Sequence, residues 1–201
     1  NNGNGTFSDV GCLAGVFETD WSWSGLLFDM DNDGLRDLHV TNGYRREVTN
    51  RDFIDFTLPE IQKASGGGKR LRDIYPDFND FLKLVPTFKV RNFCFQNKGN
   101  WFFDDESGKW MTIPASWSCG AAWADFDADG DLDMVVNNLA EPAFIYKNLT
   151  REQEKGNYLQ LKLQGNPKNS FAVGASAIIH YNGGQVQYLE NYPTRGIFSS
   201  V

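Results

Sequence analysis

Residues 29–37 read Asp29-Met30-Asp31-Asn32-Asp33-Gly34-Leu35-Arg36-Asp37, and residues 125–133 read Asp125-Phe126-Asp127-Ala128-Asp129-Gly130-Asp131-Leu132-Asp133. Both stretches fit the pattern D-x-D-x-D-G-x-x-D. Carboxylates at positions 1, 3, 5 and 9 can converge on one point only when the chain wraps around it, and glycine at position 6 permits the bend. Four carboxylates so close would repel one another without a cation between them. Oxygen ligands in that number suit Ca²⁺, whereas Mg²⁺ prefers to keep its waters.

Each loop is expected to supply four carboxylates and one backbone carbonyl to its ion. The predicted ligands are Asp29, Asp31, Asp33 and Asp37 with the carbonyl of Leu35, and Asp125, Asp127, Asp129 and Asp133 with the carbonyl of Asp131. The Asp131 side chain is expected to point outward. The alternative is a turn without metal, because Asp, Asn and Gly favour turns. Ordinary turns do not need four spaced carboxylates, which favours two calcium sites.

The loops differ from an EF-hand, which needs a bidentate Glu at position 12 and a helix on each side. Position 12 is Val40 in the first loop and Val136 in the second. The flanking apolar runs are Leu26-Leu27-Phe28 before the first loop and Met134-Val135-Val136 after the second. Their length and composition are typical of strands. Each loop is therefore predicted to join two strands.

Separate motifs recur at one spacing along the chain. The two loops lie 96 positions apart, and Asn1-Asn2-Gly3-Asn4 recurs 96 positions later as Asn97-Lys98-Gly99-Asn100. A shorter offset of 51 relates residues 93–97 to residues 144–148. A shared offset indicates an internal repeat, here with a unit of roughly 50 residues, close to one four-stranded propeller blade. The first unit then carries an insertion of roughly 45 residues.

The repeat resembles the FG-GAP/VCBS β-propeller repeats, in which an apolar strand, the D-x-D-x-D-G-x-x-D loop, a second strand and an N-x-G-x-G-x-F-x-D turn follow one another. The tail from Asn157 to Val201 resembles the ASPIC/UnbV module through Pro193-Thr194-Arg195-Gly196 and Ser199-Ser200. That module follows such repeats in proteins of the cartilage-acidic-protein type and in many surface proteins of Bacteroidota. The resemblance implies an all-β fold of propeller blades, extracellular or at the cell surface, and outer-membrane-associated or periplasmic if bacterial.

Four segments are expected from this resemblance and from the repeat. They are the end of one blade and half of the next with the first loop (1–43), a helical insertion (44–90), the remaining strands with the second loop (91–150) and a truncated ASPIC/UnbV-like β module (151–201). Two blades cannot close a propeller, which usually needs 4–8. The chain is therefore expected to be a partial propeller from a longer protein.

Charge and cysteine content narrow the class of partner. The net charge of −7 argues against nucleic acid, because phosphate binding needs a basic face. Nine of the 26 acidic residues lie in the two loops, so much of the acidity is local to the predicted metal sites. Three cysteines cannot form a complete disulfide framework, and Cys94 and Cys119 are expected to be buried thiols, whereas Cys12 is open to pairing outside this segment. No apolar run is long enough to span a membrane.

The insertion has a different composition from its surroundings. It contains nine of the 19 basic residues. Asp52 precedes Phe53, Ile54 and Phe56 as a capped amphipathic start would, and apolar residues from Leu71 to Val85 recur at helical spacing around Pro76. Two short helices are predicted, joined by the flexible residues 65–68. A lid over a sheet edge or over the C-terminal module, and a partner-binding element, are equally compatible with this pattern.

Few residues suggest catalysis. His39 and His180 each lie in a strand-like run, where a lone histidine is more often structural. Aromatic residues precede the loops, namely Trp21, Trp23, Trp117 and Trp123. A platform for sugar rings is one interpretation, and packing between blades is the one we favour.

Two hypotheses follow. The first is a non-enzymatic, calcium-stabilised propeller fragment that binds protein or glycan at the cell surface, within an outer-membrane complex if bacterial. The second is a carbohydrate-active enzyme or a glycan-binding subunit of a polysaccharide-uptake system. Exposed tryptophans beside a pocket with two carboxylates that bind no metal would favour the second, and fully packed tryptophans would favour the first.

Overall fold

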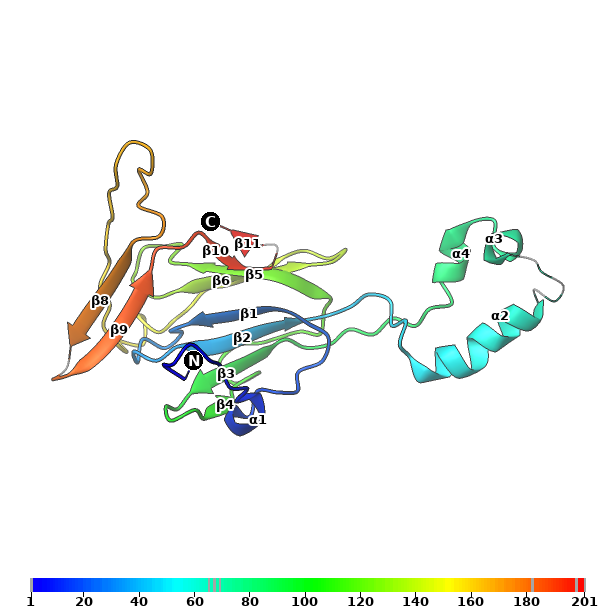
Figure 1. Cartoon of the computed structure of the whole chain (residues 1–201), viewed down its shortest axis with the longest axis horizontal. Helices are drawn as coiled ribbons and strands as arrows, with labels where there is room; N and C mark the ends of the chain where they lie inside the picture. Colours follow the sequence, from blue (N-terminus) through cyan, green and yellow to red (C-terminus); the bar gives the residue numbers. More distant parts are fainter. Residues whose placement is uncertain are drawn as a thin grey trace.

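The computed structural model describes residues 2–64, 66, 68, 70–181, 183–197 and 199–200. The regular structure in this part of the chain is mainly antiparallel β-sheet with a few short helices (Figure 1). The predicted all-β class is therefore confirmed. The described residues do not form a closed ring of sheets. None of their helices has the length and apolarity needed to cross a membrane.

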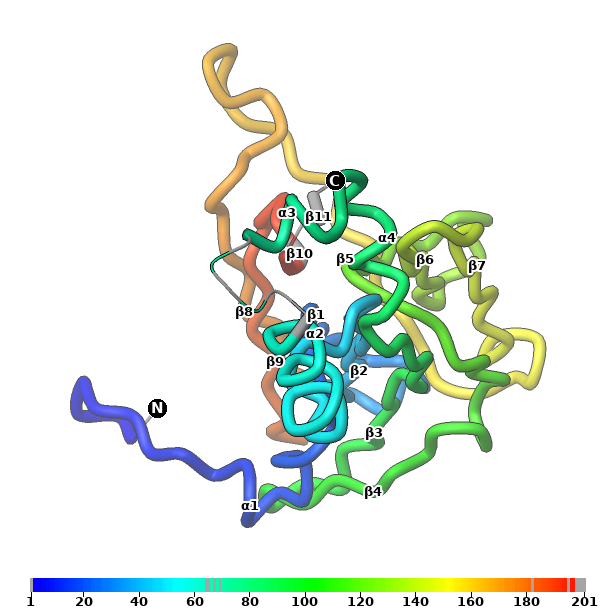
Figure 2. Tube along the Cα trace, turned by 90° about the vertical axis from the view of Figure 1, so that its right-hand side faces the viewer, coloured from blue at the N-terminus to red at the C-terminus, as the bar shows by residue number. Residues whose placement is uncertain are grey.

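Two antiparallel sheets form the body of the molecule, and each is a meander in sequence order. The first contains β1 (Ser22–Phe28), β2 (Asp37–Asn42), β3 (Phe93–Asn97) and β4 (Phe103–Asp105). The second contains β5 (Ser118–Ala124), β6 (Asp133–Asn138) and β7 (Phe144–Tyr146). β1 contacts β5, and both sheets extend outward from this pair, so that β4 and β7 are the outermost strands (Figure 2).

The two sheets repeat one another in their strand pairing. Gly25 pairs with Val40 in the first sheet, and Ala121 pairs with Val136 in the second, 96 positions later. The register is irregular just before this pair in β1, and again just before it in β5. The repeat predicted from the loops therefore extends to the backbone pairing of the strands around them.

A core of apolar side chains lies where the sheets meet. In β1 buried and exposed residues alternate, as expected for a strand that packs on one face. The buried members of the core are Leu26, Phe28, Met30, Cys94, Ala121, Met134 and Val136. Trp123 packs against this cluster and stacks on Phe28, with ring centroids 5.6 Å apart. Since the loops lie at the ends of these strands, the core fixes their position.

Residues 44–90, the helical arm, leave the first sheet after β2 and return at β3. Their helices are η1 (Phe53–Thr57, a π-helical turn), α2 (Leu58–Ala64), α3 (Leu71–Ile74) and α4 (Phe78–Leu82). The second predicted helix is split at Pro76, whose ring and missing N–H disfavour a continuous helix. The predicted cap Asp52 makes no capping hydrogen bond; Asn50 instead accepts one from the Phe53 N–H. Of the predicted flexible link, Ser65 and Gly67 lie outside the described residues.

The helices of the arm stand away from both sheets, at the end of the molecule opposite the hairpin of residues 176–190 (Figure 1). The arm has its own small core, in which Phe53, Ile61 and Val85 are buried. It therefore neither covers a sheet edge nor packs on the C-terminal module, so the interpretation as a lid is wrong.

Both ends of the chain are less regular than predicted. Residues 2–10 form no strand, and the short helix α1 (Gly11–Ala14) follows them. The C-terminal part contains the hairpin β8 (Ser176–Tyr181) and β9 (Gln185–Glu190) and the short pair β10 (Thr194–Gly196) and β11 (Ser199–Ser200). β10 contacts β1 and β5, which joins this part to the two sheets.

Candidate metal centres and an aromatic pocket

Each acidic loop joins the first two strands of its sheet, the first between β1 and β2 and the second between β5 and β6. The glycine at position 6 has a left-handed backbone in both loops, with φ of 96° at Gly34 and 100° at Gly130. The residue at position 4 is also left-handed, with φ of 55° at Asn32 and 61° at Ala128. The same turn is therefore formed twice.

The carboxylate at position 1 is held by the backbone of its own loop. Asp29 accepts hydrogen bonds from the N–H groups of Asp33 (3.1 Å) and Gly34 (2.9 Å). Asp125 accepts the equivalent bonds from Asp129 (3.2 Å) and Gly130 (3.1 Å). These bonds curl each loop around its acidic side chains.

The carboxylate at position 5 accepts from the N–H at position 7. The distances are 2.7 Å from Leu35 to Asp33 and 3.1 Å from Asp131 to Asp129. The Leu35 side chain itself is exposed.

The carboxylate at position 9 ties each loop to the third strand. Asp37 is buried and accepts from the N–H groups of Met30 (2.9 Å) and Asn97 (2.8 Å). In the second sheet Asp133 accepts from Phe126 (2.9 Å) and Asn148 (2.8 Å). Asn97 and Asn148 were not predicted to support the loops, although their shared offset of 51 was visible in the sequence.

Carboxylate oxygens converge in both loops. Asp29, Asp31 and Asp33 place one oxygen each within 4.8 Å of one another. In the second loop the three convergent residues are Asp125, Asp127 and Asp133, and a further group combines Asp127 and Asp129 with Glu152. Asp37 is not a member of the first group, and Glu152 was not predicted to lie near the second loop.

The first loop fits a hard cation. Asp31 Oδ1 is buried and has no hydrogen-bond partner among the described residues, while Oδ2 accepts from Gln96 Nε2 at 2.7 Å. A buried oxygen without a donor is costly unless a cation or water contacts it. Burial also raises the pKa of Asp29 to about 6 and that of Asp37 to about 7, and neighbouring Asp charges add to both shifts. A bound cation would favour the ionised forms and offset this cost.

The second loop differs because it contains a lysine. Lys147 Nζ lies 2.6 Å from Asp127 Oδ2 and 2.6 Å from Glu152 Oε1. The hydrogen bond from Lys147 lowers the pKa of Asp127. Lys147 follows β7 at the position that Gln96 occupies in β3, since Phe95 and Tyr146 pair with the equivalent residues Leu38 and Met134. Lys147 therefore forms an ion pair with a carboxylate of the second loop, whereas Lys98, the lysine near the first loop, donates to Gln96 and acts on Asp33 only through its charge.

Asp131 corrects one prediction. Its side chain does not point outward but is fully buried, where Oδ2 accepts from the Arg151 N–H at 3.0 Å. Oδ1 has no partner among the described residues, and burial raises the pKa of this carboxyl. Asp131 thus joins the second loop to the turn that follows β7.

The tryptophans have separate roles, and Trp21, Trp23 and Trp117 lie at the end of the strands from which the helical arm leaves the first sheet. Trp23 donates to the Gly43 carbonyl and Trp117 to the Phe88 carbonyl, both at 2.6 Å. Trp123 packs on the core, so the predicted packing role is confirmed for this residue. Trp21 is 43% exposed and stacks on Tyr44, with ring centroids 5.0 Å apart.

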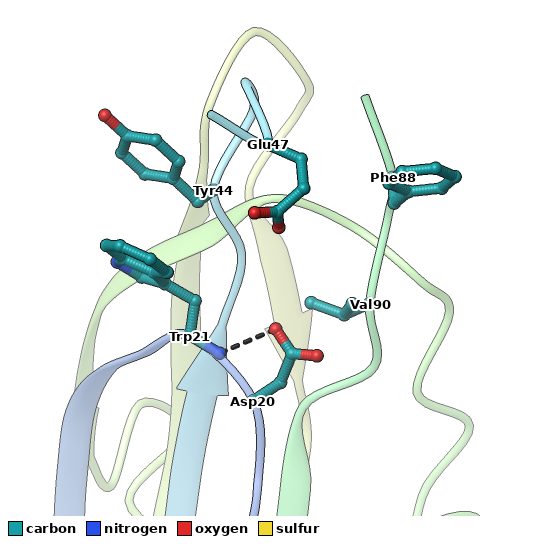
Figure 3. A pocket seen from close by; sticks show the side chains of 6 residues that line it. All are labelled: Asp20, Trp21, Tyr44, Glu47, Phe88 and Val90. Atoms are coloured by element: carbon teal, nitrogen blue, oxygen red, sulfur yellow. Dashed lines mark hydrogen bonds between the residues drawn. The ribbon is translucent and has the colours of Figure 1, made fainter. Parts of the chain in front are cut away.

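Trp21 and Tyr44 line a cavity of about 180 Å³ together with Asp20, Glu47, Phe88 and Val90. Figure 3 shows the two rings on one side, Phe88 and Val90 on the other, and the two carboxylates pointing toward each other between them. Neither carboxylate belongs to an acidic loop. An exposed tryptophan beside such a pair of carboxylates favours the second hypothesis, which includes a glycan-binding subunit.

The two histidines form no catalytic group. His39 in β2 is fully buried, and neither ring nitrogen has a hydrogen-bond partner among the described residues. Burial lowers its pKa to about 4, so the ring is neutral at physiological pH. His180 lies exposed in the β8–β9 hairpin.

Comparison of the chain with known protein families, with curated proteins and with solved structures finds no match. The geometry of the two loops and of the aromatic pocket therefore carries the functional argument.

Proposed function

We propose that the chain is part of a calcium-stabilised β-propeller that serves in recognition or assembly outside the cell, as a binding module and not as a catalyst. The observation that carries this proposal is the duplicated loop. The same backbone hydrogen bonds hold convergent carboxylates in both copies, and the strands on either side of each copy pair in the same register. Two adjoining sheets that extend outward from neighbouring strands are what two consecutive blades would look like.

Ca²⁺ is the cation that best fits the donor set. All the candidate ligands are oxygens, and their number exceeds what Mg²⁺ usually takes from protein. Asp29, Asp31 and Asp33 would hold the ion in the first loop, and Asp125, Asp127 and Asp133 in the second. When bound, the ion supplies positive charge that offsets the repulsion between these carboxylates.

A structural role for the ion follows from the position of the ligands. In each loop they come from one connection between two strands, so an ion there fastens these strands together and leaves little room for a substrate. Calcium concentrations are high outside cells, and short loops with only oxygen ligands fit that setting.

Thermal unfolding tests the proposal. An ion that binds only the folded form stabilises it by about 2.7 kcal/mol per site at a hundredfold excess over Kd. The melting temperature should fall in excess chelator and recover with Ca²⁺ more effectively than with Mg²⁺. Equal melting curves in chelator and in saturating Ca²⁺ would reject the structural role.

Glycan binding is the recognition function that one observation favours. Trp21 lies exposed beside Asp20 and Glu47, whereas Trp23, Trp117 and Trp123 are committed to hydrogen bonds or packing. A hydrolytic activity that followed ion occupancy while stability stayed constant would instead favour the enzyme alternative.

A further inference from the structure

The aromatic pocket is built on a fixed frame. The base of the arm consists of the two chain segments by which the arm leaves the first sheet and returns to it. They are joined by the hydrogen bond from the Glu47 N–H to the Pro86 carbonyl, at 2.9 Å. Val90 and Ser116 exchange two backbone hydrogen bonds, of 3.2 and 2.9 Å. Together with the indole bonds of Trp23 and Trp117, these contacts hold both walls of the cavity on the ends of the sheets. The pocket is therefore largely formed before any ligand arrives.

Gly43 brings the two sheets into contact just below the pocket. Its φ is 148°, and a Cβ added there would lie 2.5 Å from Trp117 Cα. Its N–H donates to the Trp21 carbonyl at 3.0 Å, which fixes the backbone that carries the exposed indole. A glycine is needed because a side chain would push the second sheet away from the pocket.

The polar groups of the pocket have unused bonding capacity. Asp20 Oδ1 accepts from the Trp21 N–H at 2.6 Å, and Glu47 Oε1 accepts from the Thr49 hydroxyl. The second oxygen of each carboxylate has no donor among the described residues, and the Trp21 indole N–H has no acceptor there. The basic side chains beside the pocket are directed elsewhere, since Arg45 and Lys89 lie over the Trp117 ring, 5.7 and 5.1 Å from its centroid. The cavity thus offers two carboxylate acceptors next to an aromatic surface.

We propose that this pocket binds one sugar residue of a neutral glycan. The apolar C–H face of a sugar ring fits against aromatic side chains, which combine a large rigid apolar surface with a polar edge. Neighbouring sugar hydroxyls donate to Asp20 and Glu47 in charge-assisted hydrogen bonds. Acidic sugars are excluded, because their carboxylates face those of the pocket. The proposal names the ligand class for the recognition role proposed above and rests on that role.

The test measures binding of defined oligosaccharides to the whole chain in saturating Ca²⁺ by calorimetry. The probes are cellohexaose, xylohexaose and mannohexaose at millimolar concentration, with hexagalacturonate as the acidic counterpart. At least one neutral hexamer should bind, and hexagalacturonate should not. Trp21→Ala should weaken binding by about tenfold or more, and Glu47→Gln should weaken it by a smaller factor.

Trp101→Ala is the matched control, because Trp101 is 61% exposed and lies outside the pocket. It should leave binding unchanged, and all three variants should retain the calcium-dependent melting temperature. Absence of binding for all three neutral hexamers, or equal binding by wild type and Trp21→Ala, would overturn the proposal. Calcium-dependent stabilisation without sugar binding would reject the pocket alone, whereas sugar binding without any effect of calcium on melting would reject the calcium role alone.

Discussion

Lys147 and Gln96 occupy equivalent positions, and each contacts the Asp at position 3 of its own loop. Lys147 places a positive charge where an incoming Ca²⁺ would meet Asp127. The two loops should therefore differ in affinity although their motifs are the same. A cation must displace the lysine or share the carboxylate with it in the second loop, whereas Gln96 is neutral.

A reciprocal exchange tests this inequality. Lys147→Gln should tighten Ca²⁺ binding at the second loop severalfold, because the competing charge is removed, and Gln96→Lys should weaken the first loop by a similar factor. Calorimetric titration of both variants with Ca²⁺ measures the two sites. Unchanged affinities in both variants would show that these side chains do not influence the loops.

His39 makes the fold sensitive to acid. Burial lowers its folded-state pKa from 6.5 to about 4, so the folded protein holds the neutral ring. Its contribution to stability is complete above pH 6.5 and is lost as the pH falls toward 4, because the unfolded chain takes up the proton first. Between pH 7 and pH 5 the loss is about 2 kcal/mol.

Replacement of His39 by leucine, which has similar bulk and no proton to gain, isolates this effect. Wild type should lose about 2 kcal/mol more unfolding free energy than His39→Leu between pH 7 and pH 5. Urea titrations at both pH values, each in saturating Ca²⁺, give the two differences. Parallel loss in both proteins would assign the acid sensitivity to other groups.

At the scale of the elements, each loop combines two kinds of carboxylate. Asp37 and Asp133 accept from backbone N–H groups of the loop and from one at or just after the end of the third strand, so they stabilise the fold with or without metal. Asp31 instead carries a buried oxygen without a partner among the described residues, which leaves that oxygen available to a cation. Position in the motif alone does not separate these roles, because Asp133, unlike Asp37, also belongs to a convergent group of carboxylates.

Two substitutions in the first loop distinguish the roles. Asp37→Ala leaves two N–H groups without acceptors and should cost about 2–5 kcal/mol both in chelator and in Ca²⁺. Asp31→Asn should change little in chelator but should remove most of the calcium-dependent gain. In the second loop Asp127→Asn should likewise remove most of the calcium-dependent gain, whereas Asp133→Ala should lose both contributions, because Asp133 also belongs to the convergent group. Thermal melting in both conditions measures all four, and a calcium-independent loss in Asp31→Asn would contradict the assignment.

The spacing of the loops predicted the strands around them because glycine at position 6 and the apolar flanks are local signals that the sheets then satisfy. The burial of Asp131 was not predictable, since it depends on Arg151, which comes from a distant turn.

Residues 157–163 alternate in polarity as a strand does, yet they are not in a strand, because alternation alone does not supply a neighbouring strand for the backbone hydrogen bonds. Cys94 is buried as predicted, whereas Cys119 is only partly buried. The pocket also escaped prediction, since its lining comes from three separate segments, residues 20–21, 44–47 and 88–90.

At the scale of the whole molecule, the helical arm and the sheets are separate in their packing. The core at the junction of the sheets contains no residue from the arm, and the arm buries Phe53, Ile61 and Val85 within itself. The pocket depends on the base of the arm alone, through Tyr44, Glu47 and Phe88. The outer part of the arm should therefore be dispensable both for the calcium loops and for the pocket.

Replacement of residues 50–84 by a short Gly-Ser linker tests this separation. The variant should keep the far-ultraviolet spectrum of the sheets and the rise in melting temperature with Ca²⁺, because the loops and their core are untouched. It should also keep binding of the neutral hexamer that wild type binds, since the Glu47–Pro86 hydrogen bond still closes the base of the arm. A control that replaces residues 44–90 should retain the calcium response but lose the sugar, because Tyr44, Glu47 and Phe88 are removed with it. If the shorter deletion abolished the calcium response, the arm would be an integral part of the sheet structure and the two would form one cooperative unit.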